Sequence, residues 1–199
     1  MVLVVKLQLL RMSGFNMIRL LKSIHLYGTY KRVCTFLINH VFTSMKPFSS
    51  NIKCAILRSV GHRIGKGTTI VSPVYIIGKV EIGDACWINR GFTVQGDGLV
   101  RIGDNCDIAP DVSFLTGGHQ IGTSKRRAGT GEVYTITVGN GCWIGARSTL
   151  LGNIVVNDGS VVAACTCVNR DVPENVVVGG VPAKVIRRLD SEDFESSEK

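Results

Sequence analysis

Aliphatic residues recur at every sixth position through the middle of this chain. The pattern runs without a slip through residues 138–168 and occurs earlier over residues 64–94 and 102–114. Such a period is neither the 3.6 residues of an α-helix nor the 2 residues of a half-buried strand. All fifteen positions are apolar although 45% of the chain is hydrophobic: Ile64, Ile70, Ile76, Ile82, Ile88, Val94, Ile102, Ile108, Phe114, Val138, Ile144, Leu150, Val156, Val162 and Val168.

The six-residue period predicts an all-β solenoid in which each repeat forms a short strand and a turn. Three repeats complete one turn of a triangular coil, so fifteen repeats predict about five coils. Glycine often follows the aliphatic residue, as in Val138-Gly139, and we expect it to supply the left-handed backbone of a tight corner. Cys86, Cys106 and Cys142 fall at matching repeat positions, which predicts small core residues.

We divide the chain into a basic helical segment (1–60), a solenoid domain (61–186) and a tail (187–199). Residues 1–80 contain twelve Lys or Arg and no Asp or Glu. The first segment shows apolar residues at helix spacing, with a predicted linker at residues 47–51. It either covers the open end of the solenoid or lies on an anionic membrane surface, and both roles are compatible.

Charge and cysteine content narrow the function classes. No apolar run approaches the ~20 residues of a membrane span, and no secretory signal is expected. Seven cysteines without a CxxC pair fit a reducing compartment, so we expect a cytoplasmic protein, peripheral to the membrane where the first segment touches lipid. Nucleic-acid binding has the N-terminal charge in its favour but no recognisable motif, and it is not expected.

Two interruptions of the repeat are candidates for function. The first falls at Gln95–Gly98, and a longer polar loop runs from Thr116 to Tyr134. Long loops inside a compact solenoid are usually functional. His119 lies where the long loop leaves the coil, and histidine is the usual proton acceptor near neutral pH. We therefore expect His119 to be a general base.

An ordered set of motifs resembles the hexapeptide-repeat O-acetyltransferases, which include galactoside, maltose and nodulation-factor enzymes and those acting on capsule or colanic-acid sugars. The resemblance covers about residues 61–188. It implies a left-handed parallel β-helix, although most crossovers between parallel strands are right-handed. The motifs are Ile102-Gly103-Asp104-Asn105, Thr116-Gly117-Gly118-His119, Cys142-Trp143-Ile144-Gly145-Ala146 and Gly180-Val181-Pro182-Ala183-Lys184.

The resemblance implies an acetyl-CoA-dependent O-acetyltransferase that modifies a saccharide, with surface polysaccharide synthesis as its setting. His119 takes the proton of a sugar hydroxyl, which attacks the thioester directly, and a backbone N–H near Ala146 binds the oxyanion. Asn89 and Asp97 match positions that bind the sugar. The alternative for Asn89 is a corner residue, and for Asp97 a turn former.

The same resemblance implies where acetyl-CoA binds and how the chain assembles. The residues it assigns to acetyl-CoA are Ala146 and Ala164 along the pantetheine arm, and Asn169, Arg170, Lys184 and Arg187 at the adenine and phosphates. Three subunits pack side by side with each site between neighbours, so a homotrimer is expected. Lys125-Arg126-Arg127 replaces the acidic and aromatic residues of many relatives, which leaves the acceptor open.

Three alternatives stay open. An antibiotic or serine O-acetyltransferase keeps the chemistry and changes the acceptor. A zinc carbonic anhydrase needs several histidines on adjacent coils. The repeat region contains a single histidine, His119, so no metal site is expected. A non-enzymatic binding solenoid predicts flat, repetitive faces, which the long loop carrying the histidine opposes.

Overall fold

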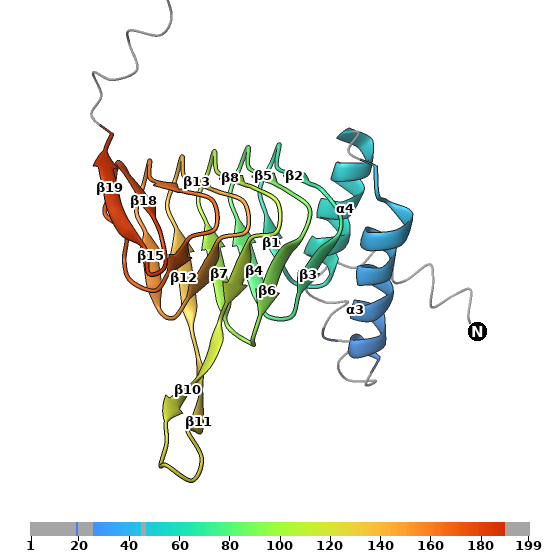
Figure 1. The fold of residues 1–199 in the computed structure, drawn as a ribbon. Helices are drawn as coiled ribbons and strands as arrows, with labels where there is room; N and C mark the ends of the chain where they lie inside the picture. The colour runs from blue at the N-terminus through green and yellow to red at the C-terminus, as the bar shows by residue number, and fades with distance from the viewer. Residues whose placement is uncertain (1–18, 20–25, 45–46, 190–199) are drawn as a thin grey trace, which may run out of the picture.

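A computed structural model describes residues 19, 26–44 and 47–189 of the chain. They form a three-sided column of stacked short strands, with two helices across one end and a hairpin projecting from one side (Figure 1). Within these residues no helix has the length and apolarity needed to cross a bilayer.

The strands stack into three sheets, one on each side of the column. The first sheet contains β1 (Arg63–Ile64), β4 (Lys79–Ile82), β7 (Leu99–Ile102), β12 (Thr135–Val138) and β15 (Ile154–Val156). The second contains β2 (Thr69–Ile70), β5 (Trp87–Ile88), β8 (Asp107–Ile108), β13 (Trp143–Ile144), β16 (Val161–Val162), β18 (Val176–Gly179) and, antiparallel at its end, β19 (Lys184–Arg188). The third contains β3 (Val74–Ile76), β6 (Phe92–Gln95), β9 (Ser113–Leu115), β14 (Thr149–Leu151) and β17 (Cys167–Val168).

The chain makes about six turns. The turn beyond the predicted five is built by Val172, which bridges to Val156, and by β18. Apart from β19, the pairings within these three sheets are parallel and in register, so that Ile82 lies beside Ile102 and Val138 beside Val156. The predicted solenoid is confirmed.

The aliphatic residues of the six-residue repeat fill the interior of the column. Fourteen of the fifteen are buried, and Ile76 is partly buried against the same core. Full burial of one such side chain stabilises the fold by roughly 1.5–3 kcal/mol. Because equivalent residues stack coil upon coil, the repeat in the sequence becomes one continuous core.

Glycines at the corners have a different role from the predicted one. Left-handed backbone occurs three residues after the aliphatic residue, as at Ala85 (φ 53°) and Arg147 (φ 60°). Gly145 directly follows its aliphatic residue, and a Cβ there would lie 2.6 Å from the amide nitrogen of Ala164. The expectation of a left-handed backbone at these glycines is therefore wrong, because what they provide is room for the next coil.

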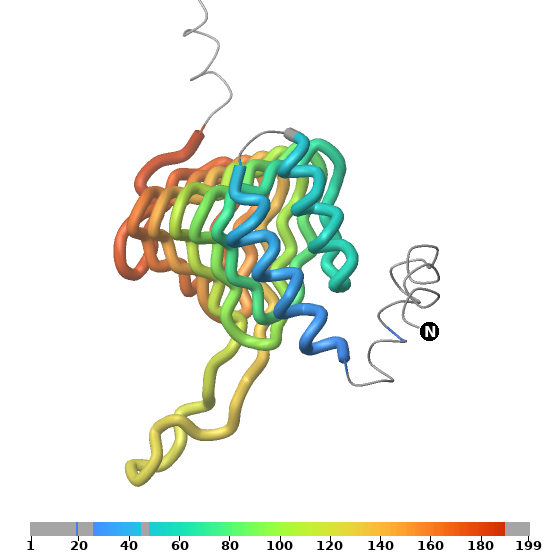
Figure 2. Tube along the Cα trace, turned by 90° about the vertical axis from the view of Figure 1, so that its right-hand side faces the viewer, coloured from blue at the N-terminus to red at the C-terminus, as the bar shows by residue number. Residues whose placement is uncertain are grey.

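Helices α3 (Tyr27–Phe36) and α4 (Pro47–Ser59), joined by the π-helical turn η1 (Leu37–Val41), cover the first coil (Figure 2). Asn39 exchanges two hydrogen bonds of 2.9 Å with the backbone of Val74. Ser50 Oγ accepts a hydrogen bond from the Ile70 amide. The predicted linker at residues 47–51 is wrong, since α4 begins there and buries Ser50. Apart from Arg19, residues 1–25 of the predicted helical segment lie outside the described residues.

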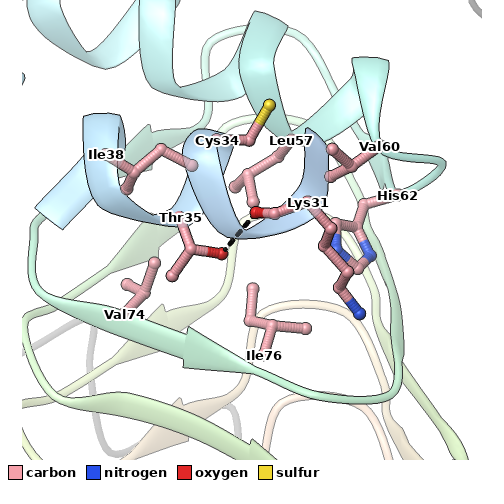
Figure 3. Close-up of a pocket in the computed structure, with 9 residues that line it drawn as sticks. All are labelled: Lys31, Cys34, Thr35, Ile38, Leu57, Val60, His62, Val74 and Ile76. Atoms are coloured by element: carbon pink, nitrogen blue, oxygen red, sulfur yellow. Dashed lines mark hydrogen bonds between the residues drawn. The ribbon is translucent and has the colours of Figure 1, made fainter. Parts of the chain in front are cut away.

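A small cavity of about 10 Å³ remains between α3 and the first coil (Figure 3). His62 lies in its wall and accepts a hydrogen bond from the Val80 amide at 3.3 Å. Burial, with smaller contributions from the charges of Lys31 and Lys79, lowers the pKa of His62 to about 4. Lys31 Nζ donates to the Ile77 carbonyl at 2.7 Å. The cavity is too small for a ligand and marks the junction between cap and coil.

Candidate functional site

A hairpin carries the candidate general base. The chain leaves the third sheet after β9, forms β10 (Gly117–Ile121) and β11 (Ala128–Val133), and returns to the first sheet through β12. At its base the Tyr134 amide donates to the Thr116 carbonyl at 2.8 Å, and Thr116 is buried. The end of the hairpin nearest the column is thus fixed, while the rest of the hairpin projects away from the column (Figure 1).

An open cleft of about 610 Å³ lies between the base of this hairpin and the turn that precedes it in the column. This volume is within the usual range for small-molecule sites, about 300–1,000 Å³. His119 and Asp97 both line it, so the structure brings these two predicted residues together. The complete lining is Gln95, Gly96, Asp97, Leu115, Gly117, Gly118, His119, Gly131, Glu132 and Val133.

Glu132 is a cleft residue that the sequence analysis missed. Tyr134 Oη donates to its Oε2 at 2.7 Å, and this hydrogen bond to a carboxylate raises the pKa of Tyr134. The tyrosine lies over Gly118, where a Cβ would come within 2.6 Å of Tyr134 Oη. The sequence does show an acid two residues before an aromatic residue, Glu132 and Tyr134, at the end of the long loop. It does not show which face of the hairpin meets the cleft.

A second group of predicted residues lies on another edge of the column. We call the edge between the second and third sheets the alanine edge; it comprises residues 89–90, 109–110, 145–146 and 163–164 of four successive coils. Ala146 and Ala164 are neighbours there, because the Cys165 amide donates to the Ala146 carbonyl at 2.8 Å. Asn89 lies at the same edge, two coils before Ala146, and its Oδ1 accepts a hydrogen bond from the Arg90 amide.

The amide of Ala146 distinguishes this edge from the edge between the first and second sheets. At the latter, Asp104 Oδ1 accepts a hydrogen bond from the Asp84 amide, and Asp158 Oδ1 accepts one from the Asn140 amide. The coil beyond Ala146 presents Ala164, which has no acceptor group in its side chain. Within the described residues the Ala146 N–H makes no hydrogen bond. This donor is free to bind an oxyanion.

The remaining predicted residues lie away from the alanine edge. We call the edge between the third and first sheets the hairpin edge, since the hairpin leaves from it. Asn169 and Arg170 follow β17 at that edge and are exposed. Lys184 and Arg187 are exposed on β19 at the end of the second sheet. One chain therefore does not unite the predicted site: His119 and Asp97 belong to the hairpin edge, and Asn89, Ala146 and Ala164 to the alanine edge.

No three His, Cys, Asp or Glu side chains gather as a metal site would require in the part of the chain that the structure describes.

Comparison with known proteins gives consistent matches over most of the chain, although no family model matches it. The galactoside O-acetyltransferase of Escherichia coli K12 is 30% identical over 165 residues, 82% of this chain and 81% of that protein. A putative colanic acid biosynthesis acetyltransferase of E. coli K12 is 31% identical over 69% of this chain and 75% of its own length. The hexapeptide-repeat acetyltransferase of Vibrio cholerae, solved with acetyl-CoA, superposes with a TM-score of 0.72 at 28% identity over 84% of this chain and 90% of that one.

Proposed function

This chain belongs to the hexapeptide-repeat O-acetyltransferase family, and from this premise we propose that it transfers an acetyl group from acetyl-CoA to a saccharide hydroxyl in surface polysaccharide synthesis. The observation that carries the proposal is the cleft that His119 shares with Asp97, in a column that also offers the free Ala146 amide. The activities in the names of the E. coli relatives, galactoside acetylation and colanic acid biosynthesis, support a saccharide acceptor.

The proposed reaction needs no covalent enzyme intermediate. His119 takes the proton of the acceptor hydroxyl as its oxygen attacks the thioester carbonyl carbon. The Ala146 amide donates a hydrogen bond to the oxygen that becomes negative. When the carbon–sulfur bond breaks, His119 returns the proton to the sulfur of coenzyme A. Proton transfer by a positioned histidine contributes about 10² to 10⁴ in rate.

A homotrimer is the assembly that this division of the site supports. The reaction needs His119 of the hairpin edge beside Ala146 of the alanine edge, and a single column keeps these edges apart. If the hairpin edge of one chain faces the alanine edge of the next, the contact is heterologous, and a three-fold rotation closes it into a ring. Each ring then contains three sites, each built by two subunits.

The residues proposed for acetyl-CoA divide by chemistry. Ala146 and Ala164 are small, which leaves room along the alanine edge for the pantetheine arm. Arg170, Lys184 and Arg187 are exposed cations suited to phosphate groups. Asn169 is proposed as a polar contact beside them. A cytoplasmic location fits this donor substrate and the free thiols of the described chain.

Release of coenzyme A thiol in the presence of acetyl-CoA and a panel of saccharides tests the proposal. The wild-type protein is expected to turn over at least one sugar, and His119→Ala to lose about 10² to 10⁴ in kcat while binding coenzyme A with nearly unchanged affinity. The control is His40→Ala, an exposed histidine on η1. Turnover of serine or an antibiotic with no turnover of any sugar would exclude the saccharide acceptor, and full activity of His119→Ala would exclude the general base.

A further inference from the structure

The outward face of the cap presents apolar side chains to solvent. Val33 is 51% exposed, Phe36 57% and Phe48 77%, and a group of exposed apolar side chains is a mark of surfaces that bind a protein partner or a membrane. We call this surface the cap face; it comprises Leu26 directly before α3, Val33 and Phe36 on α3, Val41 in η1, and Phe48 at the start of α4.

Helical spacing puts Leu26, Val33 and Phe36 on one stripe. Leu26 and Val33 are seven residues apart and Val33 and Phe36 three apart, the separations at which side chains share a helix face. The ring of His40 stacks on Phe36 with 4.9 Å between centroids, which continues the stripe into η1. The opposite side of the cap is already used, since Cys34 of α3 and Ile38 of η1 are buried where the cap meets the first coil.

Charge around the cap face identifies its partner. Residues 1–80, which include α3, η1 and α4, contain twelve Lys or Arg and no Asp or Glu. Arg32 is exposed on α3 beside Val33. An apolar stripe beside an exposed arginine, in a segment whose sequence contains no acid, is suited to the interface of a bilayer with negatively charged headgroups. We infer that the cap face binds the surface of an anionic phospholipid membrane.

The position of the cap links this contact to the cleft. Lys31 of α3 lies close enough to Asp97 for that carboxylate to oppose the lowering of the Lys31 pKa by burial. Asp97 lines the cleft with His119. In both views the N-terminal end of α3 lies on the same side of the column as the hairpin (Figures 1 and 2). A bilayer on the cap face therefore lies near the acceptor cleft. This consequence rests on the proposed function and suits saccharides carried on lipids.

Vesicle flotation with the full chain tests the inference. We expect binding to phosphatidylcholine vesicles that contain phosphatidylglycerol, much weaker binding to pure phosphatidylcholine, and weakening by salt. The double variant Val33→Ser/Phe36→Ser should lower the partition coefficient by roughly tenfold or more, because two apolar side chains no longer enter the interface. The matched control is Val155→Ser, an exposed valine on β15 of the first sheet, remote from the cap.

Each outcome decides the inference. Absence of binding to anionic vesicles overturns it, as does binding that the double variant leaves intact. Self-association that the double variant abolishes, without vesicle binding, would assign the cap face to a second copy of the chain. Acetyl transfer to a soluble sugar should be equal in the wild type and the double variant, so failure of the membrane contact is distinguishable from failure of the proposed reaction.

Discussion

At the scale of single residues, the site depends on small or missing side chains. Gly118 has no Cβ and so admits Tyr134, which holds Glu132 in the wall of the cleft. Ala164 has no acceptor and so leaves the Ala146 amide free. In each case a small neighbouring residue leaves room for a functional group or leaves that group without a hydrogen-bond partner. Substitutions at the supporting residues should therefore change substrate binding without changing the fold.

Tyr134→Phe is the first such substitution. It removes the hydroxyl that fixes Glu132 Oε2, so the carboxylate is no longer held toward the acceptor. One hydrogen bond contributes about 0.5–1.5 kcal/mol, and we expect the KM for the acceptor to rise by roughly two- to tenfold with kcat little changed. Initial rates at varied acceptor and varied acetyl-CoA measure this. Tyr75→Phe, an exposed tyrosine on β3, is the control. A rise confined to the KM for acetyl-CoA would show that Glu132 does not serve the acceptor.

A ladder of small hydrogen-bonding side chains belongs to the scale of elements. Along the edge between the first and second sheets, five residues of successive coils each donate to a carbonyl of the following coil. Cys86 Sγ donates to Gly103 at 3.0 Å and Cys106 Sγ to Gly139 at 2.9 Å. The prediction of small core cysteines is confirmed, and the hydrogen bonds add a reason for their size. The ladder comprises Thr68, Cys86, Cys106, Cys142 and Ser160.

Cys106 is the residue at which to test the ladder. Cys106→Ser keeps a donor of similar size, as Ser160 does at the end of the ladder, and we expect the free energy of unfolding to change by less than about 1 kcal/mol. Cys106→Leu adds volume to a fully buried position and should destabilise the column by about 1–3 kcal/mol. Urea unfolding of both variants measures the difference. Equal stability of the serine and leucine variants would show that the corner tolerates bulk.

The junction between the cap and the column should be sensitive to acid. His62 is buried and neutral, and its pKa is about 4 in the folded protein against 6.5 when exposed. A histidine with a lowered pKa binds its proton more readily in the unfolded chain, so its contribution to stability is lost as the pH falls from about 6.5 to 4. The loss is about 3 kcal/mol at pH 4. Lys31 and Lys79 add to it because both repel the protonated ring.

Thermal unfolding of the wild type and His62→Gln between pH 7 and pH 4 measures this contribution. The wild type should lose more stability over the interval than the variant, which carries no titrating group at residue 62. Carboxylates such as Glu81, whose pKa is lowered chiefly by its hydrogen bond from Lys79, titrate in both proteins and cancel in the comparison. Parallel pH profiles for the two proteins would contradict a neutral, buried His62.

At the scale of the whole molecule, the periodic part of the fold could be predicted and the aperiodic part could not. Six-residue spacing fixes which residues point inward, because stacked coils repeat one geometry. The linker predicted at residues 47–51 failed because Ser49 and Ser50, polar residues typical of loops, are instead buried on α4. Ser49 Oγ donates to the Phe42 carbonyl, and Ser50 Oγ accepts from the Ile70 amide. The six-residue spacing could not identify Glu132 as a cleft residue, because the hairpin does not follow the repeat. Which side chains of the hairpin point toward the cleft depends on the contact between Thr116 and Tyr134.

The division of the site between two edges makes the assembly itself testable through mixed oligomers. His119→Ala removes the base from the hairpin edge, and Ala146→Trp fills the alanine edge; each protein alone should be inactive. When the two are co-expressed in equal amounts, a site is intact where an Ala146→Trp chain supplies His119 and a His119→Ala chain supplies Ala146. Random mixing makes this combination about one quarter of all sites, so about a quarter of wild-type activity should return. A site formed within one chain would recover none, since every chain in the mixture carries a defect.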